Sequence, residues 1–291
     1  MAKAYKARFV VSGNPEPLSE GGIDFMDKTT PFQATWSWKP FIACHLMALA
    51  LLLLWLWEPT RSAMDLFDFS LFSLLNQPLA TNEAWRLTWA VASTRPFDLL
   101  VGVILLLLLI RGDWIFKASQ ARAATFGFLC AAVVLVVVRI LYAKLAHKLG
   151  WQHASISSIA PDAVRLEHFF PQWEDTPFEV KDESARSFPG DHASVLLIWA
   201  LFLTLFARTA LQWVVIWGLA LLFMLPRLVA GAHWGQDDYI GGVQMALVAL
   251  AWSCFTPFAA VASAALVRWT DPLFRLAAKI PLLKRLSVVA A

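Results

Sequence analysis

The sequence predicts an all-α, polytopic membrane protein with six transmembrane helices, and three observations carry this prediction. Hydrophobic residues make up 59% of the 291 positions and charged residues only 15%, whereas soluble domains have roughly 45–50% and about 25%. Six stretches approach the roughly 20 apolar residues that a membrane-spanning helix needs. Several of the fifteen tryptophans flank these stretches, where membrane proteins place an aromatic belt.

Three parts are expected along the chain. Residues 1–39 are polar and predict a water-exposed cytoplasmic extension, residues 40–267 hold the spans, and residues 268–291 predict a basic cytoplasmic tail. Pro226 and Pro272 are expected to interrupt helices, because proline lacks an amide hydrogen. The expected spans are Pro40–Trp57, Pro96–Phe116, Ala123–Tyr142, His192–Ala207, Leu211–Leu225 and Tyr239–Val261.

The distribution of lysine and arginine predicts the orientation. Basic residues dominate before the first span, after the second and fourth spans, and in the tail, whereas the long segments 58–95 and 142–191 mix both charge signs. Because basic loops stay in the cytoplasm, both termini are expected there and the two long segments outside.

Composition excludes several classes of protein. A net charge of +3 is too small to indicate a nucleic-acid partner. The three cysteines lie in apolar stretches and support neither a disulfide framework nor a four-cysteine zinc site; they are Cys44, Cys130 and Cys254. Three histidines outside the spans fit no zinc spacing, so no metal is expected; they are His147, His153 and His168.

Ionisable residues that orientation does not require gather at the outer ends of the third to sixth expected spans. Such groups are costly at membrane depth and indicate a functional site. Pro189-Gly190 predicts a turn that opens a helix, whose first amides suit a phosphate. Arg227 can fork two hydrogen bonds onto phosphate oxygens. His233 and Asp237 are four residues apart, so the carboxylate can orient the imidazole as a nucleophile or base.

These residues resemble the signature of the type 2 phosphatidic acid phosphatases, the PAP2 superfamily. That signature is Lys-x6-Arg-Pro, then Pro-Ser-Gly-His, then Ser-Arg-x5-His-x3-Asp near the ends of neighbouring helices. The third motif matches in spacing at Arg227, His233 and Asp237, and the second matches over residues 188–192. The resemblance implies a PAP2-like helical core over roughly residues 90–260.

The sequence departs from this signature at three points. Gly190 replaces the serine of the second motif, and Pro226 replaces that of the third. No Lys-x6-Arg-Pro is present; Lys144 is assigned the lysine role because it follows the third expected span. The candidates for the missing arginine are Lys148, Arg165, Lys181, Arg186 and Arg95.

The resemblance implies a mechanism without a metal or other cofactor. His233 attacks phosphorus and becomes a phosphohistidine, Asp237 holds its ring, and His192 protonates the leaving oxygen. Asp191 is expected either to cap its helix or to contact substrate. The implied phosphate-binding residues are Arg227, Lys144, Gly190, Asp191, Lys148 and Arg186.

The predicted function is therefore a lipid phosphatase of the bacterial cytoplasmic (inner) membrane, with its site facing the periplasm. The expected substrate is a polyprenyl diphosphate such as undecaprenyl diphosphate. Two alternatives stay open: a phosphotransferase that moves phosphate onto a second lipid such as lipid A, and a non-catalytic lipid-phosphate transporter or scaffold. The long segment 152–186 is expected to act as a lid or recognition element, and the sequence predicts no oligomeric state.

Overall fold

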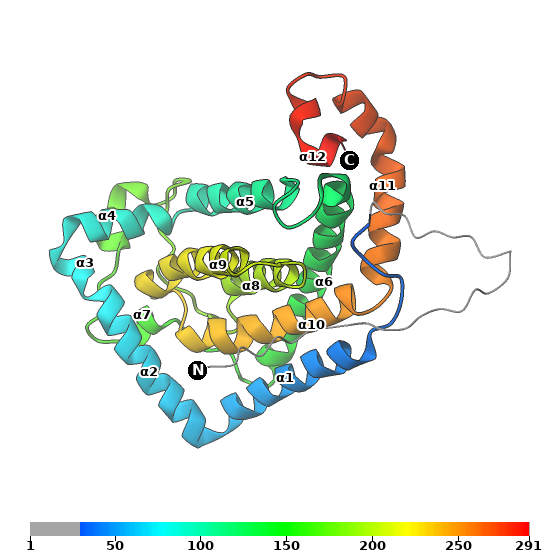
Figure 1. Cartoon of the computed structure of the whole chain (residues 1–291). Coiled ribbons are helices and arrows are strands. Elements are labelled where there is room, and N and C mark those ends of the chain that lie inside the picture. The colour runs from blue at the N-terminus through cyan, green and yellow to red at the C-terminus, as the bar shows by residue number, and fades with distance from the viewer. Residues whose placement is uncertain (1–29, 291) are drawn as a thin grey trace, which may run out of the picture.

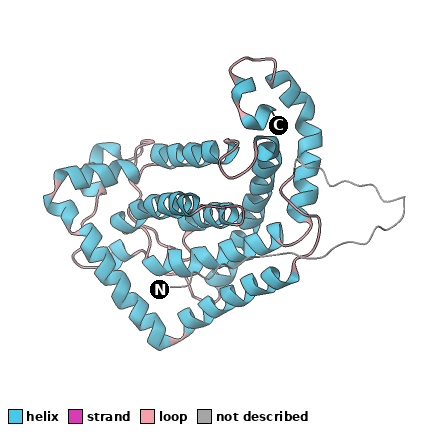
Figure 2. Cartoon of the chain, viewed as in Figure 1, coloured by secondary structure: helices cyan, strands magenta, loops and turns pink. Residues whose placement is uncertain are grey.

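The computed structural model describes residues 30–290, and every regular element within that range is a helix (Figure 2). The all-α prediction is confirmed for this part of the chain, where the β-type pairing is one isolated bridge between Thr94 and Val180. Most of the predicted N-terminal extension, residues 1–29, lies outside the described residues.

The described residues hold nine helices of ten or more residues. The first eight are α1 (Trp38–Leu56), α2 (Glu58–Asn76), α4 (Glu83–Ala92), α5 (Arg95–Ile110), α6 (Ala121–Lys148), α8 (Asp191–Thr204), α9 (Ala210–Ala230) and α10 (Val243–Cys254). A further long helix, α11, covers Phe258–Ala277. Short helices connect them: α3 (Pro78–Thr81), α7 (Ile156–Ile159), α12 (Ser287–Ala290), the 3-10 turns η1 (Ala118–Gln120), η2 (Glu167–Phe169), η3 (Pro171–Trp173) and η5 (Leu283–Arg285), and the π-helix η4 (Asp237–Gly242).

Helix α8 lies at the centre of the bundle, where it packs against α6, α9 and α10 (Figure 1). Its 14 residues are apolar on almost every side, which is typical of a helix that is buried all round. Trp199 and Phe202 are fully buried, and the Trp199 indole donates to the carbonyl of Leu105 at 3.2 Å. Helices α2 to α4 close one end of the bundle, and α11 and α12 stand at the other (Figure 1).

Three helices are long and apolar enough to cross a membrane: α1, α6 together with η1, and α9. A fourth crossing is available if η4–α10 and α11 form one span that is bent by 67°. The other two expected spans are shorter, because α5 has 16 residues and α8 has 14. At 1.5 Å per residue, α8 is about 21 Å long against a hydrocarbon core of about 30 Å.

Two expected helix breaks are wrong and a third was missed. Pro226 lies inside α9, and Pro272 lies inside α11. A helix within an apolar bundle tolerates proline where neighbouring groups satisfy the backbone, and the Ser93 hydroxyl donates to the Pro226 carbonyl at 3.2 Å. The sixth expected span instead breaks at residues 255–257, where the Thr256 hydroxyl donates to the last turn of α10 and accepts the first amide of α11.

Candidate active site

The third motif is built at the end of α9. Arg227 lies in the last helical turn, and Gly231 ends the helix with a left-handed φ of 79°. A Cβ at Gly231 would also lie 2.6 Å from the ring of Phe72, so glycine is required for both conformation and space. This turn brings His233 back toward α9, with its amide 3.4 Å from the Arg227 carbonyl.

The second motif packs directly on the third. The amide of Gly190 donates to the carbonyl of Asp237 at 2.9 Å, and a Cβ at Gly190 would lie 2.8 Å from that oxygen. The missing side chain therefore permits close contact between the two motifs. Because the Gly190 amide is already paired, it does not point into the site as the phosphate donor expected of it.

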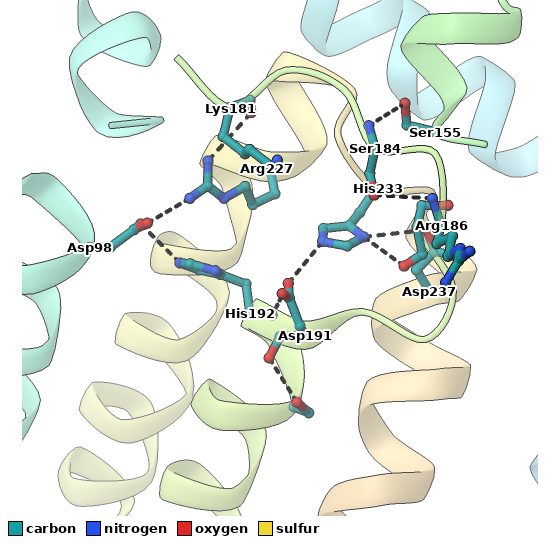
Figure 3. Close-up of polar contacts among 12 residues, drawn as sticks. Asp98, Ser155, Lys181, Ser184, Arg186, Asp191, His192, Arg227, His233 and Asp237 are labelled. Atoms are coloured by element: carbon teal, nitrogen blue, oxygen red, sulfur yellow. Dashed lines mark hydrogen bonds and ion pairs between the residues drawn. The ribbon is translucent and has the colours of Figure 1, made fainter. Parts of the chain in front are cut away.

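His233 is held on both ring nitrogens by residues of the two motifs (Figure 3). Its Nδ1 lies 3.0 Å from the Ser187 carbonyl and 3.4 Å from Asp237 Oδ2. Its Nε2 lies 3.2 Å from Asp191 Oδ1. Since Nδ1 faces the backbone and the buried Asp237, Nε2 is the nitrogen directed toward the cavity.

The carboxylates around His233 favour its charged form. Burial alone would lower the pKa of His233, but its contacts with Asp191 and Asp237, and the nearby Asp238, raise that pKa to about 10. The imidazolium is therefore the resting state at neutral pH. A substrate anion that displaces Asp191 would change this balance directly at Nε2.

His192 and Arg227 share a carboxylate that sequence reasoning missed. Asp98, in the first turn of α5, has Oδ1 at 2.9 Å from His192 Nε2 and Oδ2 at 2.6 Å from the Arg227 guanidinium (Figure 3). The same guanidinium donates to the carbonyls of Ser93 and Lys181. A single acid at the start of an otherwise apolar helix was the available signal.

Arg139 takes the place on α6 that the sequence assigned to lysine. Its guanidinium lies 2.9 Å from Asp191 Oδ2, and both Arg139 and Ala143 line the cavity. Lys144 and Lys148 are exposed and do not line it. On a helix of 3.6 residues per turn, Lys144 lies about 140° and Lys148 about 180° around from Arg139, so the structure does not bring either lysine to the site.

Residues from both motifs line one cavity of about 390 Å³, whereas Gly190 and Asp237 do not. Three of the five candidates for the missing arginine line it, namely Arg95, Lys181 and Arg186. Arg165 does not, because it pairs with Asp182, Glu167 and Glu183. The full lining is Arg95, Asp98, Arg139, Ala143, Gln152, Glu179, Val180, Lys181, Ser184, Arg186, Phe188, Pro189, Asp191, His192, Arg227, Ala232 and His233.

The segment between α6 and α8 forms one wall of this cavity rather than a free loop. Asp182 connects three parts of this segment. Its carboxylate pairs with Arg165 and accepts a hydrogen bond from the Glu167 amide, and its carbonyl accepts one from the Ser157 hydroxyl. Within residues 30–290, no group of three or more histidine, cysteine, aspartate and glutamate side chains is arranged to hold a metal ion.

Comparison with known proteins agrees with this geometry. Residues 158–260 match the model of the PAP2 superfamily, a range that includes both motifs. This match identifies residues 158–260 as a PAP2 superfamily region. The chain is also 26% identical over 226 residues to the lipid A 1-diphosphate synthase of Escherichia coli (strain K12), covering 74% of this chain and 87% of that protein. No solved structure matches the chain significantly.

This similarity supports a phosphoryl-transfer enzyme that acts as a lipid phosphatase or phosphotransferase. Together with the apolar helices, it supports a membrane protein. The predicted resemblance is thereby confirmed, while the roles of individual residues stay predictions.

Proposed function

We propose that the protein is an integral-membrane enzyme that removes a phosphoryl group from a polyprenyl diphosphate through a phosphohistidine at His233. The observation that carries this proposal is the convergence of two histidines on one cavity, each oriented by an aspartate. His192 Nε2 lies 2.9 Å from Asp98, and His233 Nδ1 lies 3.4 Å from Asp237. Such pairs suit a nucleophile and a general acid.

In the proposed reaction, the substrate anion displaces the Asp191 carboxylate from His233 Nε2. Nε2 first loses its proton to solvent, and the neutral ring is the reactive form. Nε2 then forms a bond to phosphorus as the bond to the leaving oxygen breaks, and His192 gives that oxygen a proton. Arg227 and Arg139 hold the phosphoryl oxygens, which develop charge in the transition state. An acceptor then attacks the phosphohistidine, returns its proton to His192 and releases His233.

Apolar surface beside the cavity supports a lipid as substrate. The Arg139–Asp191 pair joins α6 to α8 at the mouth of the site. One turn further into the bundle on each helix, Val136 and Val195 are about half exposed. A headgroup bound between the two charged residues would leave its hydrocarbon tail against these valines, where burial of apolar area is favourable.

A six-span topology fits the position of the site, and we propose it for the membrane-bound protein. The cavity is lined from the N-terminal ends of α5 and α8 and from the C-terminal ends of α6 and α9. This alternation is what successive antiparallel crossings produce. With the basic segments inside, both termini are cytoplasmic and the cavity faces the periplasm of a bacterial inner membrane.

The second step decides between a phosphatase and a phosphotransferase. Water as acceptor gives hydrolysis, whereas a second lipid as acceptor gives transfer. The relative that is named as a lipid A 1-diphosphate synthase favours transfer to a phosphorylated lipid such as lipid A as the second candidate function. Both candidates use the same phosphohistidine.

The test follows labelled phosphate from undecaprenyl diphosphate in vesicles that contain the purified protein and EDTA. We expect His233→Ala to abolish turnover, a loss of at least about 10³-fold, because the variant lacks the nucleophile on which both steps depend. Label appears as free phosphate for hydrolysis, or on lipid A when that acceptor is supplied.

The matched control is His168→Ala, since His168 is an exposed histidine that contacts only Glu167. Turnover that survives in His233→Ala contradicts the nucleophile assignment. Binding without any turnover in the wild type supports the transporter or scaffold alternative instead. Turnover that EDTA stops contradicts the metal-free mechanism.

A further inference from the structure

A third histidine lies behind the proposed nucleophile. His153, in the segment that follows α6, is mostly buried, with 20% of its side chain exposed. Its ring stacks on Phe188 at 5.9 Å and meets Trp234 edge to face at 5.7 Å. Its Nε2 lies 3.4 Å from Asp237 Oδ1. The carboxylate that orients His233 is therefore shared by a second imidazole.

The two oxygens of Asp237 have different surroundings. Oδ2 accepts the Trp234 amide at 2.8 Å and lies 3.4 Å from His233 Nδ1. Oδ1 is fully buried and has no hydrogen-bond partner among the described residues, and the same holds for His153 Nε2. Since buried polar atoms are rarely left unpaired, these two atoms are each other's natural partners.

Contacts on the other side of the His153 ring decide which of its nitrogens carry a hydrogen. The Ser187 hydroxyl lies 3.2 Å from His153 Nδ1, and the Ser187 amide donates to the His153 carbonyl at 2.9 Å. Nδ1 also lies 3.2 Å from the Ala154 carbonyl, which can only accept, and the Ser187 hydroxyl donates to the His153 carbonyl at 3.2 Å. Nδ1 therefore carries a hydrogen, and the ring donates to Asp237 from Nε2 in its imidazolium form. Ser187 also presents its carbonyl to His233 Nδ1, so His153 and His233 are braced by the same residue.

We propose that His153 is a positioning residue of the phosphoryl-transfer site, which donates from Nε2 to Asp237 Oδ1 and sets the basicity of His233 through that shared carboxylate. The inference rests on the proposed function for its kinetic consequence, but not for the His153–Asp237–His233 coupling itself. A carboxylate that shares its charge between two donors stabilises each of them less. His153 would thus lower the pKa of His233 from the value that an unshared Asp237 would give it.

Other charged groups also act on this system. His233 faces Asp191, which is itself bound to Arg139, as well as Asp237 and Asp238. Asp237 faces only His233 and His153 among the charged side chains that contact it. A change at position 153 therefore reaches His233 through the Asp237 carboxylate and through Ser187, whose backbone contacts both histidines.

The test is a histidine-selective NMR titration of the full-length protein in detergent, in which only six histidines contribute. His153→Phe keeps the aromatic packing and removes the donor, whereas His153→Gln keeps an amide donor. We expect His153→Phe to raise the pKa of His233 by at least about half a unit, and His153→Gln, which keeps a donor but no charge, to raise it by less. The His233 signal is assigned by its loss in His233→Gln.

Kinetics provide the second readout. In His153→Phe, the rising limb of the plot of kcat/KM against pH should move to higher pH together with the His233 titration. This shift lowers kcat/KM at pH 7 about 3–10-fold. KM should stay within about twofold, because His153 does not contact substrate. His168→Phe is the control in the same segment. If His153→Phe does not fold, His153→Asn replaces it, because its amide is too short to reach Asp237.

An unchanged His233 titration in the donor-free variant overturns the proposal, as does equal behaviour of the phenylalanine and glutamine variants. A loss of kcat at every pH without movement of the limb indicates a merely structural role and also overturns it. Absence of turnover in the wild type contradicts the proposed function but leaves the NMR result intact.

Discussion

Two carboxylates already bind the histidine and arginine side chains that the proposed reaction needs. Asp191 lies on the His233 nitrogen that would attack phosphorus, and Asp98 holds both His192 and the Arg227 guanidinium. Each carboxylate places negative charge where a phosphate anion would bind. The site is therefore internally neutralised, and substrate must compete with these side chains for the same partners.

Asp191→Asn tests this competition through pH. Removal of the negative charge 3.2 Å from His233 Nε2 lowers the pKa of His233 from about 10. The rising limb of kcat/KM, which requires the unprotonated ring, then moves to lower pH by about one unit or more. The measurement is a pH profile of kcat/KM beside the wild type.

The same variant has a predicted signature in stability. Since folding raises the pKa of His233, its ion pairs stabilise the protein fully below the unfolded value near 6.5, and this contribution is lost as pH rises through about 10. Asp191→Asn should therefore lower the melting temperature most at pH 6 and least above pH 10, where only the pair with Arg139 is lost. The prediction is contradicted if the rising limb of kcat/KM keeps its pH and the melting temperature falls by the same amount at every pH.

Residues at the site differ in how far the sequence could locate them. His192, His233 and Arg227 were found because their spacing matches a motif and the helix ends bring that motif together. The choice of Lys144 over Arg139 was an error of helical phase, which residue type alone does not reveal. Asp98 could not be assigned from the sequence, because its partners come from two other helices.

At the scale of elements, helix α2 holds the segment that carries Asp237. Asp68 of α2 accepts the Gln236 amide at 2.9 Å and the Tyr239 hydroxyl at 3.2 Å. Asn76, two turns later, donates to the Val229 carbonyl at the end of α9. The third motif is thus fixed from outside its own helices by an element that precedes it by more than 150 residues.

The contacts of Asp68 with Gln236 and Tyr239, called here the α2 clamp, lead to a prediction. Burial raises the pKa of Asp68 to about 6, so its contribution to stability is present below the unfolded value near 3.9 and is lost as pH rises through about 6. Asp68→Asn keeps an acceptor for Gln236 and carries no charge. We expect its melting temperature to equal that of the wild type near pH 4 and to exceed it above pH 6.

The matched variant Asp68→Ala leaves the amide and the hydroxyl without an acceptor, which costs about 1–3 kcal/mol and lowers kcat by loosening Asp237. Asp162→Asn, an exposed acid in the segment after α7, is the control. Equal effects of the asparagine and alanine variants at every pH would refute the clamp.

Long apolar stretches of the sequence predicted where helices form, but they did not predict where helices end or bend. The all-α class and the positions of α1, α6 and α9 agree with the expected spans, because long apolar stretches have few alternatives. The break at residues 255–257 depends on one threonine hydroxyl that serves two helices. Such a contact is specific to the folded chain.

At the scale of the whole molecule, the candidate cavity and the C-terminal helices α11 and α12 lie at opposite ends of the bundle (Figure 1). The predicted boundary between residues 267 and 268 falls inside α11, so the basic tail continues a helix instead of starting a separate part. Beyond it, α12 docks against the start of α6. The tail therefore belongs to the packed structure.

Arg122, at the start of α6, makes this attachment. Its buried guanidinium donates to the carbonyls of Val288 and Val289 at 3.0 and 2.9 Å, lies 3.4 Å from Asp271, and stacks on Phe274 at 4.3 Å. A single side chain thus satisfies two carbonyls and one carboxylate. Its loss should weaken the fold at the end that the cavity does not touch.

We expect Arg122→Ala to lower the free energy of unfolding by about 1–3 kcal/mol, because buried acceptors lose their donor, while kcat/KM stays within about twofold. A chain that ends at Leu286 removes the same contacts from the other side. Since both changes break one interaction, the double variant should lose less than the sum of the single losses. Arg268→Ala, an exposed residue of α11, is the control in denaturant titrations in detergent. Strict additivity would mean that Arg122 does not hold the tail, and a fall in kcat/KM would mean that the two ends of the bundle are coupled.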